Sequence, residues 1–206
     1  MGYLRRDFKR SSGERRYRKF YVIASEGINP ERAYFEMLNV MLEKSDRDIR
    51  IKFISGGNNK SAPNQVLARM DDYIREGKMN DDDEAWLVID KDQWPDEQLS
   101  QLHQWSQAKD NYNLAVNNPK FEYWLLLHFE DSSAITHGNC TDRLHKHLPD
   151  YDKRIDEQKV KPGIIAAIKR AKSRDVPACI DWPRNTGTTV YRLVECIMSE
   201  VENDNQ

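Results

Sequence analysis

Residues 85–89 read Ala-Trp-Leu-Val-Ile and run directly into Asp90-Lys91-Asp92. A stretch that is apolar at every position is typical of an interior strand of a parallel sheet, because helices cover both faces of such a sheet. Carboxylates at the end of such a strand lie at the edge of the sheet where α/β proteins form their sites. The sequence therefore predicts a parallel α/β sheet with Asp90 and Asp92 at its carboxyl end.

The segments on either side of this strand alternate between strand and helix patterns. Residues 20–24 and 112–116 are β-prone runs, and residues 49–54 alternate apolar with charged side chains, which predicts a strand near a sheet edge. Between these runs, apolar residues at helical spacing predict helices over 30–44, over 64–76, after Pro95 and over 120–129. Strand alternating with helix at this spacing predicts a parallel sheet with helices on its faces.

The chain of 206 residues divides into three parts by charge and pattern. Residues 1–19 form a basic arm, residues 20–130 carry the α/β pattern, and the pattern weakens over residues 131–206. In this last part, helical spacing recurs at 164–172 and at 188–201. We therefore expect an α/β core followed by a mostly helical C-terminal extension that packs on the core.

Basic residues flank an acidic middle. Residues 1–20 carry eight Lys or Arg against two acids, residues 71–100 carry eleven acids against three bases, and residues 143–192 are basic again. This distribution is typical of a protein that binds a polyanion and has a cation site, although solvation alone also explains a short charged arm. The candidate contacts to a nucleic-acid backbone are Arg15, Arg16, Arg18, Lys153, Lys159, Lys161 and Lys169.

Composition excludes several classes of protein. No apolar run approaches the roughly 18 residues that span a bilayer, and no apolar stretch follows the basic N-terminus as a secretory signal would require. The three cysteines, Cys140, Cys179 and Cys196, are far apart, which favours reduced thiols over a disulfide frame or a zinc site. We expect a cytoplasmic globular protein that has no membrane association.

Four acids are expected at the carboxyl edge of the predicted sheet. Glu26 follows the first strand, Asp90 and Asp92 follow the third, and Glu122 follows the fourth. Parallel strands end at the same edge, so these side chains should lie near one another. Carboxylate oxygens of an Asp-x-Asp pair are the ligand type that Mg²⁺ or Mn²⁺ favours, which predicts a divalent-cation site.

Glu122 has two interpretations. It lies in an almost wholly apolar helix, and with Asn118 as cap and Pro119 first it is the fourth helical residue, whereas a capping box places its acid third. A buried carboxylate is strongly disfavoured unless it binds a metal or pairs with a cation. Glu122 is therefore either a member of the metal site or a structural brace that pairs with an Arg or Lys.

Four blocks of the sequence together resemble one protein family. They are 25–27 (Ser-Glu-Gly) with 30–31 (Pro-Glu), 89–92 (Ile-Asp-Lys-Asp), 118–129 (Asn-Pro-Lys-Phe-Glu-Tyr-Trp-Leu-Leu-Leu-His-Phe) and 185–194 (Asn-Thr-Gly-Thr-Thr-Val-Tyr-Arg-Leu-Val). These blocks span nearly the whole chain and resemble RloB-like proteins. That family is similar to the Toprim group, the metal-dependent catalytic domain of topoisomerases, primases and some nucleases. It is associated with bacterial defence against phage, often beside an ATPase partner.

The resemblance implies a Toprim-like sheet and assigns roles residue by residue. Glu26 corresponds to the Toprim glutamate and Asp90 and Asp92 to the metal-binding pair, so these three are expected to hold Mg²⁺ or Mn²⁺. Many relatives have Thr-Glu-Pro after the first glycine, whereas this chain has Asn29-Pro30-Glu31, so no role carries over to Glu31.

The expected activity is hydrolysis of phosphodiester bonds in DNA or RNA, with Glu26, Asp90, Asp92 and Glu122 as catalytic residues. One or two divalent ions would offset charge on the scissile phosphate and activate water, and a carboxylate would take the proton. The resemblance places this activity in phage defence, with an ATPase as partner protein. The alternative is a non-catalytic protein that binds nucleic acid as an adaptor for that ATPase.

Overall fold

The computed structural model describes residues 18–27, 29–45, 48–54, 56, 62–92, 94–131, 135–136, 138–152 and 154–202. Nearly all of the expected basic arm, with Arg15 and Arg16, lies outside the described residues, as does Lys153. None of the helices in the described part of the chain combines the length and the apolar character needed to span a membrane.

A five-stranded sheet forms the centre of the fold. Its strands are β1 (Lys19–Ser25), β2 (Ile49–Ile54), β3 (Glu84–Asp90), β4 (Tyr112–Asn118) and β5 (Gly187–Thr188), in the order β2-β1-β3-β4-β5. The first four strands are parallel and β5 is antiparallel to β4, so the predicted α/β fold is confirmed. The alternating segment 49–54 is an edge strand, as its pattern predicted.

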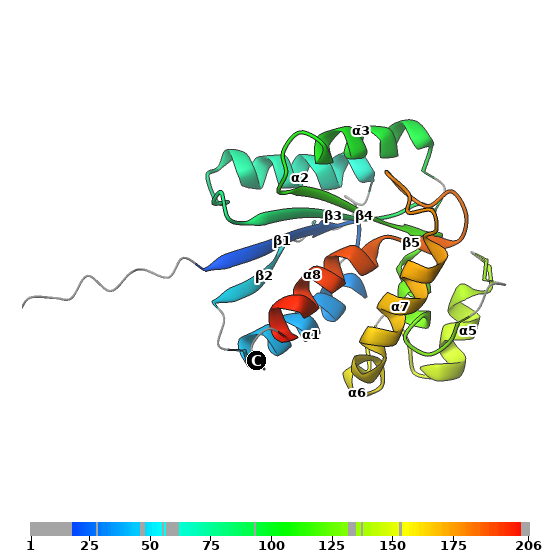
Figure 1. Cartoon of the computed structure of the whole chain (residues 1–206). Helices are drawn as coiled ribbons and strands as arrows, with labels where there is room; N and C mark the ends of the chain where they lie inside the picture. The colour runs from blue at the N-terminus through cyan, green and yellow to red at the C-terminus, as the bar shows by residue number, and fades with distance from the viewer. Residues whose placement is uncertain are drawn as a thin grey trace, which may run out of the picture.

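The apolar strand β3 contributes to two separate cores. Ala85, Leu87 and Ile89 face one apolar cluster, and Trp86 and Val88 face the other, because successive side chains of a strand point to opposite faces. Figure 1 shows α2 and α3 covering one face of the sheet, with α1, α7 and α8 on the other. Helices on both faces explain why β3 is apolar at every interior position.

The helices lie close to where the periodicity predicted them. They are α1 (Glu31–Glu43), α2 (Pro63–Arg75), α3 (Asp96–Ser106), α4 (Phe121–Leu126), α5 (Cys140–His147), α6 (Glu157–Val160), the 3₁₀ helix η1 (Lys161–Gly163), α7 (Ile164–Arg174) and α8 (Val190–Glu202). The short polar helices α5 and α6 were not predicted, because α5 buries only Cys140 and Leu144 and α6 only Val160. Too few apolar positions repeat in these segments to produce a recognisable period.

The beginning of α4 differs from the prediction. Asn118 is the last residue of β4, the Asn118–Pro119 peptide bond is cis, and Lys120 precedes the helix in an extended conformation. The helix therefore begins at Phe121, and Glu122 is its second residue rather than its fourth. The correction moves Glu122 closer to the end of β4, at the N-terminal end of a buried helix.

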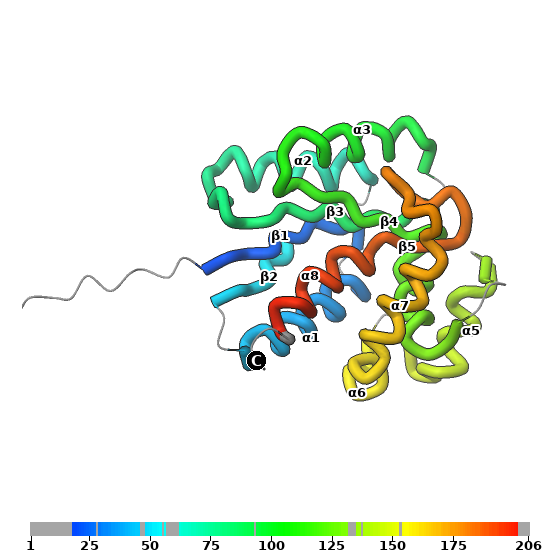
Figure 2. The backbone as a smooth tube through the Cα atoms, viewed as in Figure 1, coloured from blue at the N-terminus to red at the C-terminus, as the bar shows by residue number. Residues whose placement is uncertain are grey.

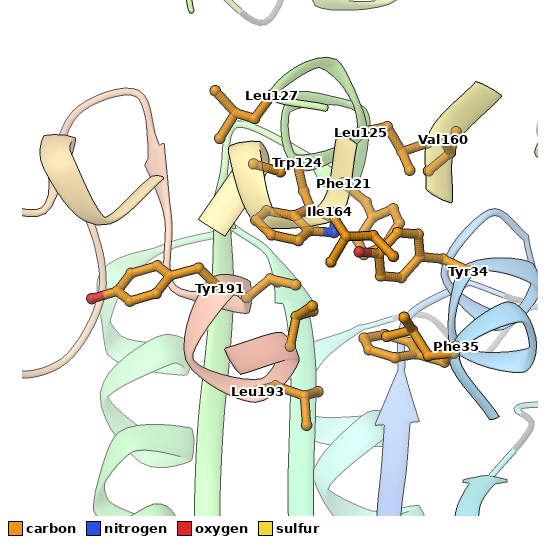
Figure 3. Close-up of a cluster of buried hydrophobic side chains, with 14 of the residues drawn as sticks. Tyr34, Phe35, Phe121, Trp124, Leu125, Leu127, Val160, Ile164, Tyr191 and Leu193 are labelled. Atoms are coloured by element: carbon orange, nitrogen blue, oxygen red, sulfur yellow. The ribbon is translucent and has the colours of Figure 1, made fainter. Parts of the chain in front are cut away.

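Aromatic packing fixes α4 against α1. Tyr34 of α1 meets the edges of the Phe121, Trp124 and His128 rings at centroid distances of 5.7, 6.0 and 5.4 Å, as Figure 3 shows for the first two. The Tyr34 hydroxyl also hydrogen-bonds His128 Nε2 at 3.1 Å, and burial lowers the pKa of His128 to about 4. This buried cluster holds the first turn of α4 at the edge of the sheet.

The C-terminal region returns to the sheet. After α7 a loop leads into β5, whose register pairs Thr188 with Asn117 of β4, and α8 then runs back beneath the sheet (Figure 2). Gly163, just before α7, packs so closely on the turn after α4 that a Cβ there would lie 2.4 Å from the backbone oxygen of His128. The pairing of β5 with β4 places the start of the 185–194 block beside the carboxyl end of β4.

Candidate functional site

The four acids predicted for the carboxyl edge of the sheet lie on three adjacent parallel strands. Glu26 follows β1, Asp90 ends β3 with Asp92 two residues later, and Glu122 is in the first turn after β4. In the sheet order β1, β3 and β4 are neighbours and run in the same direction. The fold therefore brings these acids to one edge, from segments that are up to 96 residues apart in the sequence.

Glu26 is held against the end of β3. Its Oε1 accepts the backbone N–H of Asp90 at 3.3 Å and its Oε2 accepts the indole N–H of Trp94 at 3.1 Å. Burial raises the pKa of Glu26 to about 8 despite these two bonds, and the nearby carboxylates of Glu31 and Asp92 add to the rise. Near neutral pH this side chain therefore retains a proton unless a cation approaches.

Arg69 of α2 approaches the same end of β1. Its guanidinium donates to the backbone oxygen of Ser25 at 2.5 Å, and its charge acts on Glu26. Burial lowers the pKa of Arg69 below its ordinary value, and the Glu26 carboxylate opposes that effect. Arg69 supplies some positive charge to the Glu26 side of the site.

Asp90 is surrounded by other acids. Burial raises the pKa of Asp90 well above its ordinary value, and the carboxylates of Glu31, Glu26 and Glu122 raise it further. Two neutral donors favour its ionised form: the Asn117 side-chain amide, 3.1 Å from Asp90 Oδ1, and the backbone N–H of Phe121. Neutral donors thus orient the Asp90 carboxylate, while the neighbouring carboxylates disfavour its ionised form.

Asp92 occupies an unusual backbone conformation. Its φ is 33°, in the left-handed region that Asp tolerates better than most non-glycine residues. The backbone N–H of Asp92 donates to the Pro119 oxygen at 3.0 Å, which ties this turn to the segment that leads into α4. Its side chain is exposed and lines two neighbouring cavities of about 490 Å³ each.

Glu122 faces the first of these cavities and is 8% exposed. Its Oε1 accepts a hydrogen bond from the Tyr151 hydroxyl at 3.2 Å. This partner is a neutral group, whereas the brace interpretation expects an Arg or Lys. The cavity is lined by Asp90, Asp92, Lys120, Glu122, Thr141, His145, Tyr151 and Asp152. Three of the four predicted acids thus share one cavity wall.

Glu31, to which the resemblance gave no role, belongs to this group of acids. It is buried at the start of α1 and raises the pKa of both Glu26 and Asp90. A Cβ at Gly27 would lie 2.8 Å from Glu31 Oε2, so glycine at position 27 is what allows this carboxylate to approach the end of β1. Its place just after the Ser25-Glu26-Gly27 block was the only available signal in the sequence.

Lys120 is a second residue that the sequence analysis left out. Its Nζ donates to the Thr141 hydroxyl at 2.7 Å, and its side chain lines the cavity with Asp90, Asp92 and Glu122. Lys120 therefore adds one positive charge to a cavity lined by several carboxylates, and this charge could attract an anionic ligand. Its position between Pro119 and Phe121, in the block that resembles RloB-like proteins, could have indicated it.

The predicted basic contacts are spread over the molecule. Arg18 pairs with Asp48 at 2.6 Å beside the start of β1, at the opposite end of that strand from Glu26. Lys159 pairs with Asp156 at 3.5 Å and lines a cavity of about 330 Å³ that shares Tyr151 with the acid cavity. Lys161 and Lys169 are exposed on η1 and α7. Lys159 is therefore the described member of this set whose cavity adjoins that of the acids, through Tyr151.

The acids fit a hard divalent cation by their chemistry. All are oxygen donors, and burial together with neighbouring carboxylates raises the pKa of Glu26 and of Asp90, so their ionised forms cost free energy that a cation would reduce. As the side chains stand, no three His, Cys, Asp or Glu groups within the described ranges are close enough together to hold a metal ion. The donor set is suited to a cation, while coordination by three of these side chains requires them to move.

The comparison with protein families gives one result that covers most of the chain. The model of the RloB-like protein family matches residues 21–197, a span that contains Glu26, Asp90, Asp92 and Glu122. Neither the comparison with curated proteins nor the comparison with solved structures finds a match. From the blocks that carry the resemblance and the family match that spans them, the chain belongs to the RloB-like protein family.

Proposed function

We propose that this protein is a nuclease of the Toprim type that hydrolyses phosphodiester bonds in nucleic acid with Mg²⁺ or Mn²⁺. The observation that carries the proposal is the group of acids at the carboxyl ends of β1, β3 and β4, in which burial and like charge raise the pKa of Glu26 and Asp90. Keeping these carboxylates ionised costs free energy that a bound cation would recover. Such a cost is typical of functional sites.

Each residue of the site has a task in this proposal. Glu26, Asp90 and Asp92 would hold the cation, and Glu122 would complete the site from α4. When bound, Mg²⁺ or Mn²⁺ offsets charge on the scissile phosphate and lowers the pKa of a bound water. Lys120, on the same cavity wall, would attract a phosphate oxygen of the nucleic-acid backbone. A carboxylate of the group would accept the proton of the attacking water.

The biological setting rests on the family. RloB-like proteins are associated with defence against phage, so we propose that cleavage acts in the cytoplasm as part of such a defence, beside an ATPase partner. Exposed basic residues such as Lys161 and Lys169 would then contact the nucleic-acid backbone or the partner.

The test is an activity assay on the full chain with labelled single-stranded DNA, duplex DNA and a folded RNA. We expect cleavage with Mn²⁺, none with EDTA, and a rate lower by about 100-fold or more in Asp90→Asn. Asp110→Asn is the matched control, because Asp110 is an exposed aspartate in the turn before β4, at the other end of that strand from the site.

A thermal unfolding experiment separates the nuclease from an adaptor. Mn²⁺ should raise the melting temperature of the parent protein and of Asp110→Asn, and Asp90→Asn should abolish the rise. Nucleic-acid binding without cleavage, together with no Mn²⁺-induced rise in the parent, would overturn the proposal in favour of a non-catalytic adaptor for the ATPase.

A further inference from the structure

The sequence block at residues 185–194 connects to the acid site through a buried chain of hydrogen bonds. Thr188 of β5 lies opposite Asn117 of β4 in the sheet register, and its hydroxyl is 2.7 Å from Asn117 Oδ1. The Asn117 amide nitrogen is in turn 3.1 Å from Asp90 Oδ1. The chain thus links a segment of the C-terminal region to the acid at the end of β3.

The donor and acceptor roles in this chain can be assigned. The Thr188 hydroxyl oxygen accepts the backbone N–H of Val190 at 3.1 Å, so its single hydrogen is available for Asn117 Oδ1. An amide whose oxygen accepts this bond presents its NH₂ group on the other side, toward Asp90. Thr188 therefore determines which end of the Asn117 amide faces Asp90.

Burial makes these bonds difficult to replace. Asn117 is 0% and Thr188 is 2% exposed, so bulk water does not reach their side chains to substitute for a lost partner. The bond that reaches Asp90 comes from a neutral NH₂ group, which orients the carboxylate without neutralising it. The bond therefore fixes one oxygen of Asp90 in place and puts no positive charge beside it.

We propose that Asn117 and Thr188 are positioning residues that orient Asp90 for the divalent cation. This inference rests on the proposed function, because a positioned Asp90 matters only if the site binds a cation. Neither residue touches the substrate in this arrangement, and both act through Asp90. Because Thr188 also bonds the first residue of α8, the start of the last helix and the orientation of Asp90 are set by one hydroxyl group.

The neighbouring threonine provides a matched control. Thr189 is 0% exposed, and its Oγ1 accepts the backbone N–H of Val116 at 2.8 Å. It therefore stabilises the same junction between β4 and the C-terminal segment, but its bond is to the backbone rather than to Asn117. A purely structural role of the junction would make Thr188→Val and Thr189→Val behave alike.

The experiment measures Mn²⁺ affinity from the rise in melting temperature of the full chain. We expect Asn117→Ala and Thr188→Val to weaken the apparent affinity by about 10-fold or more, as the loss of a bond that orients a metal ligand does. Thr188→Ser retains the hydroxyl and should stay within about 2-fold of the parent. Thr189→Val should melt at a lower temperature without Mn²⁺ and keep the parent's affinity.

Two further results distinguish this inference from the proposed function. If the parent binds Mn²⁺ and cleaves nucleic acid while Asn117→Ala and Thr188→Val match it, or while Thr189→Val loses as much affinity as Thr188→Val, the positioning role is wrong and the nuclease remains. If the parent shows neither Mn²⁺ binding nor cleavage, the nuclease is wrong and the positioning of a metal ligand fails with it.

Discussion

The side chains of Asp90 and Asp175 are both largely shielded from solvent, yet folding shifts their pKa values in opposite directions. The side chain of Asp175, just after α7, is 8% exposed and pairs with Arg192 at 2.8 Å. It also accepts the Tyr191 hydroxyl and the Cys179 backbone N–H, each at 2.8 Å. Burial acts to raise the pKa of Asp175, but these donors outweigh it and hold the pKa below its ordinary value.

Asp90 forms no ion pair with a cation in the described part of the chain. The charged groups that act on it are the carboxylates of Glu31, Glu26 and Glu122, and its donors are the neutral Asn117 amide and Phe121 N–H. At Asp175, which holds the loop after α7, α8 supplies the compensating cation, Arg192. At the carboxyl edge of the sheet, several acids lie close together instead. This arrangement favours a site that binds a cation from solution.

The largest expected effect is a difference in the size of the stability loss between two matched substitutions. In EDTA, Asp175→Asn should lower the free energy of unfolding by about 2 to 3 kcal/mol, because it leaves Arg192 and several donors without their carboxylate. Asp90→Asn should lower it by less, because the loss of one hydrogen-bond acceptor is offset by the removal of a carboxylate that its acidic neighbours disfavour. Urea unfolding of the two variants and the parent measures both values. A similar loss of stability in both variants would contradict the contrast between the two acids.

The dependence of stability on pH sharpens the same contrast. Glu26 has its pKa raised from 4.5 to about 8 on folding, so the folded protein retains a proton there that the unfolded chain loses. Stability without metal should therefore be highest below this range and fall as the pH rises through it, by at most about 1.4 kcal/mol per pH unit from this group. Urea unfolding between about pH 5 and pH 8 in EDTA measures the slope.

Two variants identify the source of that slope. Glu26→Gln should reduce the slope, because the amide does not titrate, and Asp90, whose pKa burial also raises, should keep its own contribution. Asp175→Asn should shift the whole curve downward without changing its slope, since the lowered pKa of Asp175 keeps that side chain ionised throughout this range. An unchanged slope in Glu26→Gln would assign the pH dependence to other groups.

The smallest expected change in stability is that of Glu122→Gln. The amide oxygen can still accept the Tyr151 hydroxyl, so the free energy of unfolding in EDTA should change by less than about 1 kcal/mol. The Mn²⁺-induced rise in melting temperature and the cleavage of nucleic acid should both be lost. A variant that keeps its Mn²⁺ response while melting several degrees lower would show that Glu122 is a structural brace.

Much of the fold could be predicted because its signals are local. The apolar run of β3, the alternating pattern of β2 and the helical spacing in α1 and α2 each lie within about a dozen residues. Strand direction then follows from the alternation of strand and helix, and it places the residues after β1, β3 and β4 at one edge. This reasoning needs no knowledge of how side chains pack.

The remaining parts of the site depend on contacts between distant segments. β5 has two residues, too few to show any period, and it is held by pairing with β4 across about 70 residues of sequence. Tyr151 reaches Glu122 from the segment after α5, and Glu31 enters the site because α1 packs closely on Gly27. No local pattern distinguishes these residues from other tyrosines or glutamates in the chain.

The sequence alone determined that acids follow the ends of parallel strands, since the hydrophobic period sets where each strand stops. Only the tertiary structure decided which acids are compensated and which are not. Asp175 follows α7 and Asp90 ends β3, and the pattern of each element is clear in the sequence. Their pKa values move in opposite directions because packing places Arg192 against one of them and three carboxylates around the other. Burial and the distance between charges are properties of the folded chain, and they set the free energy of each ionised group.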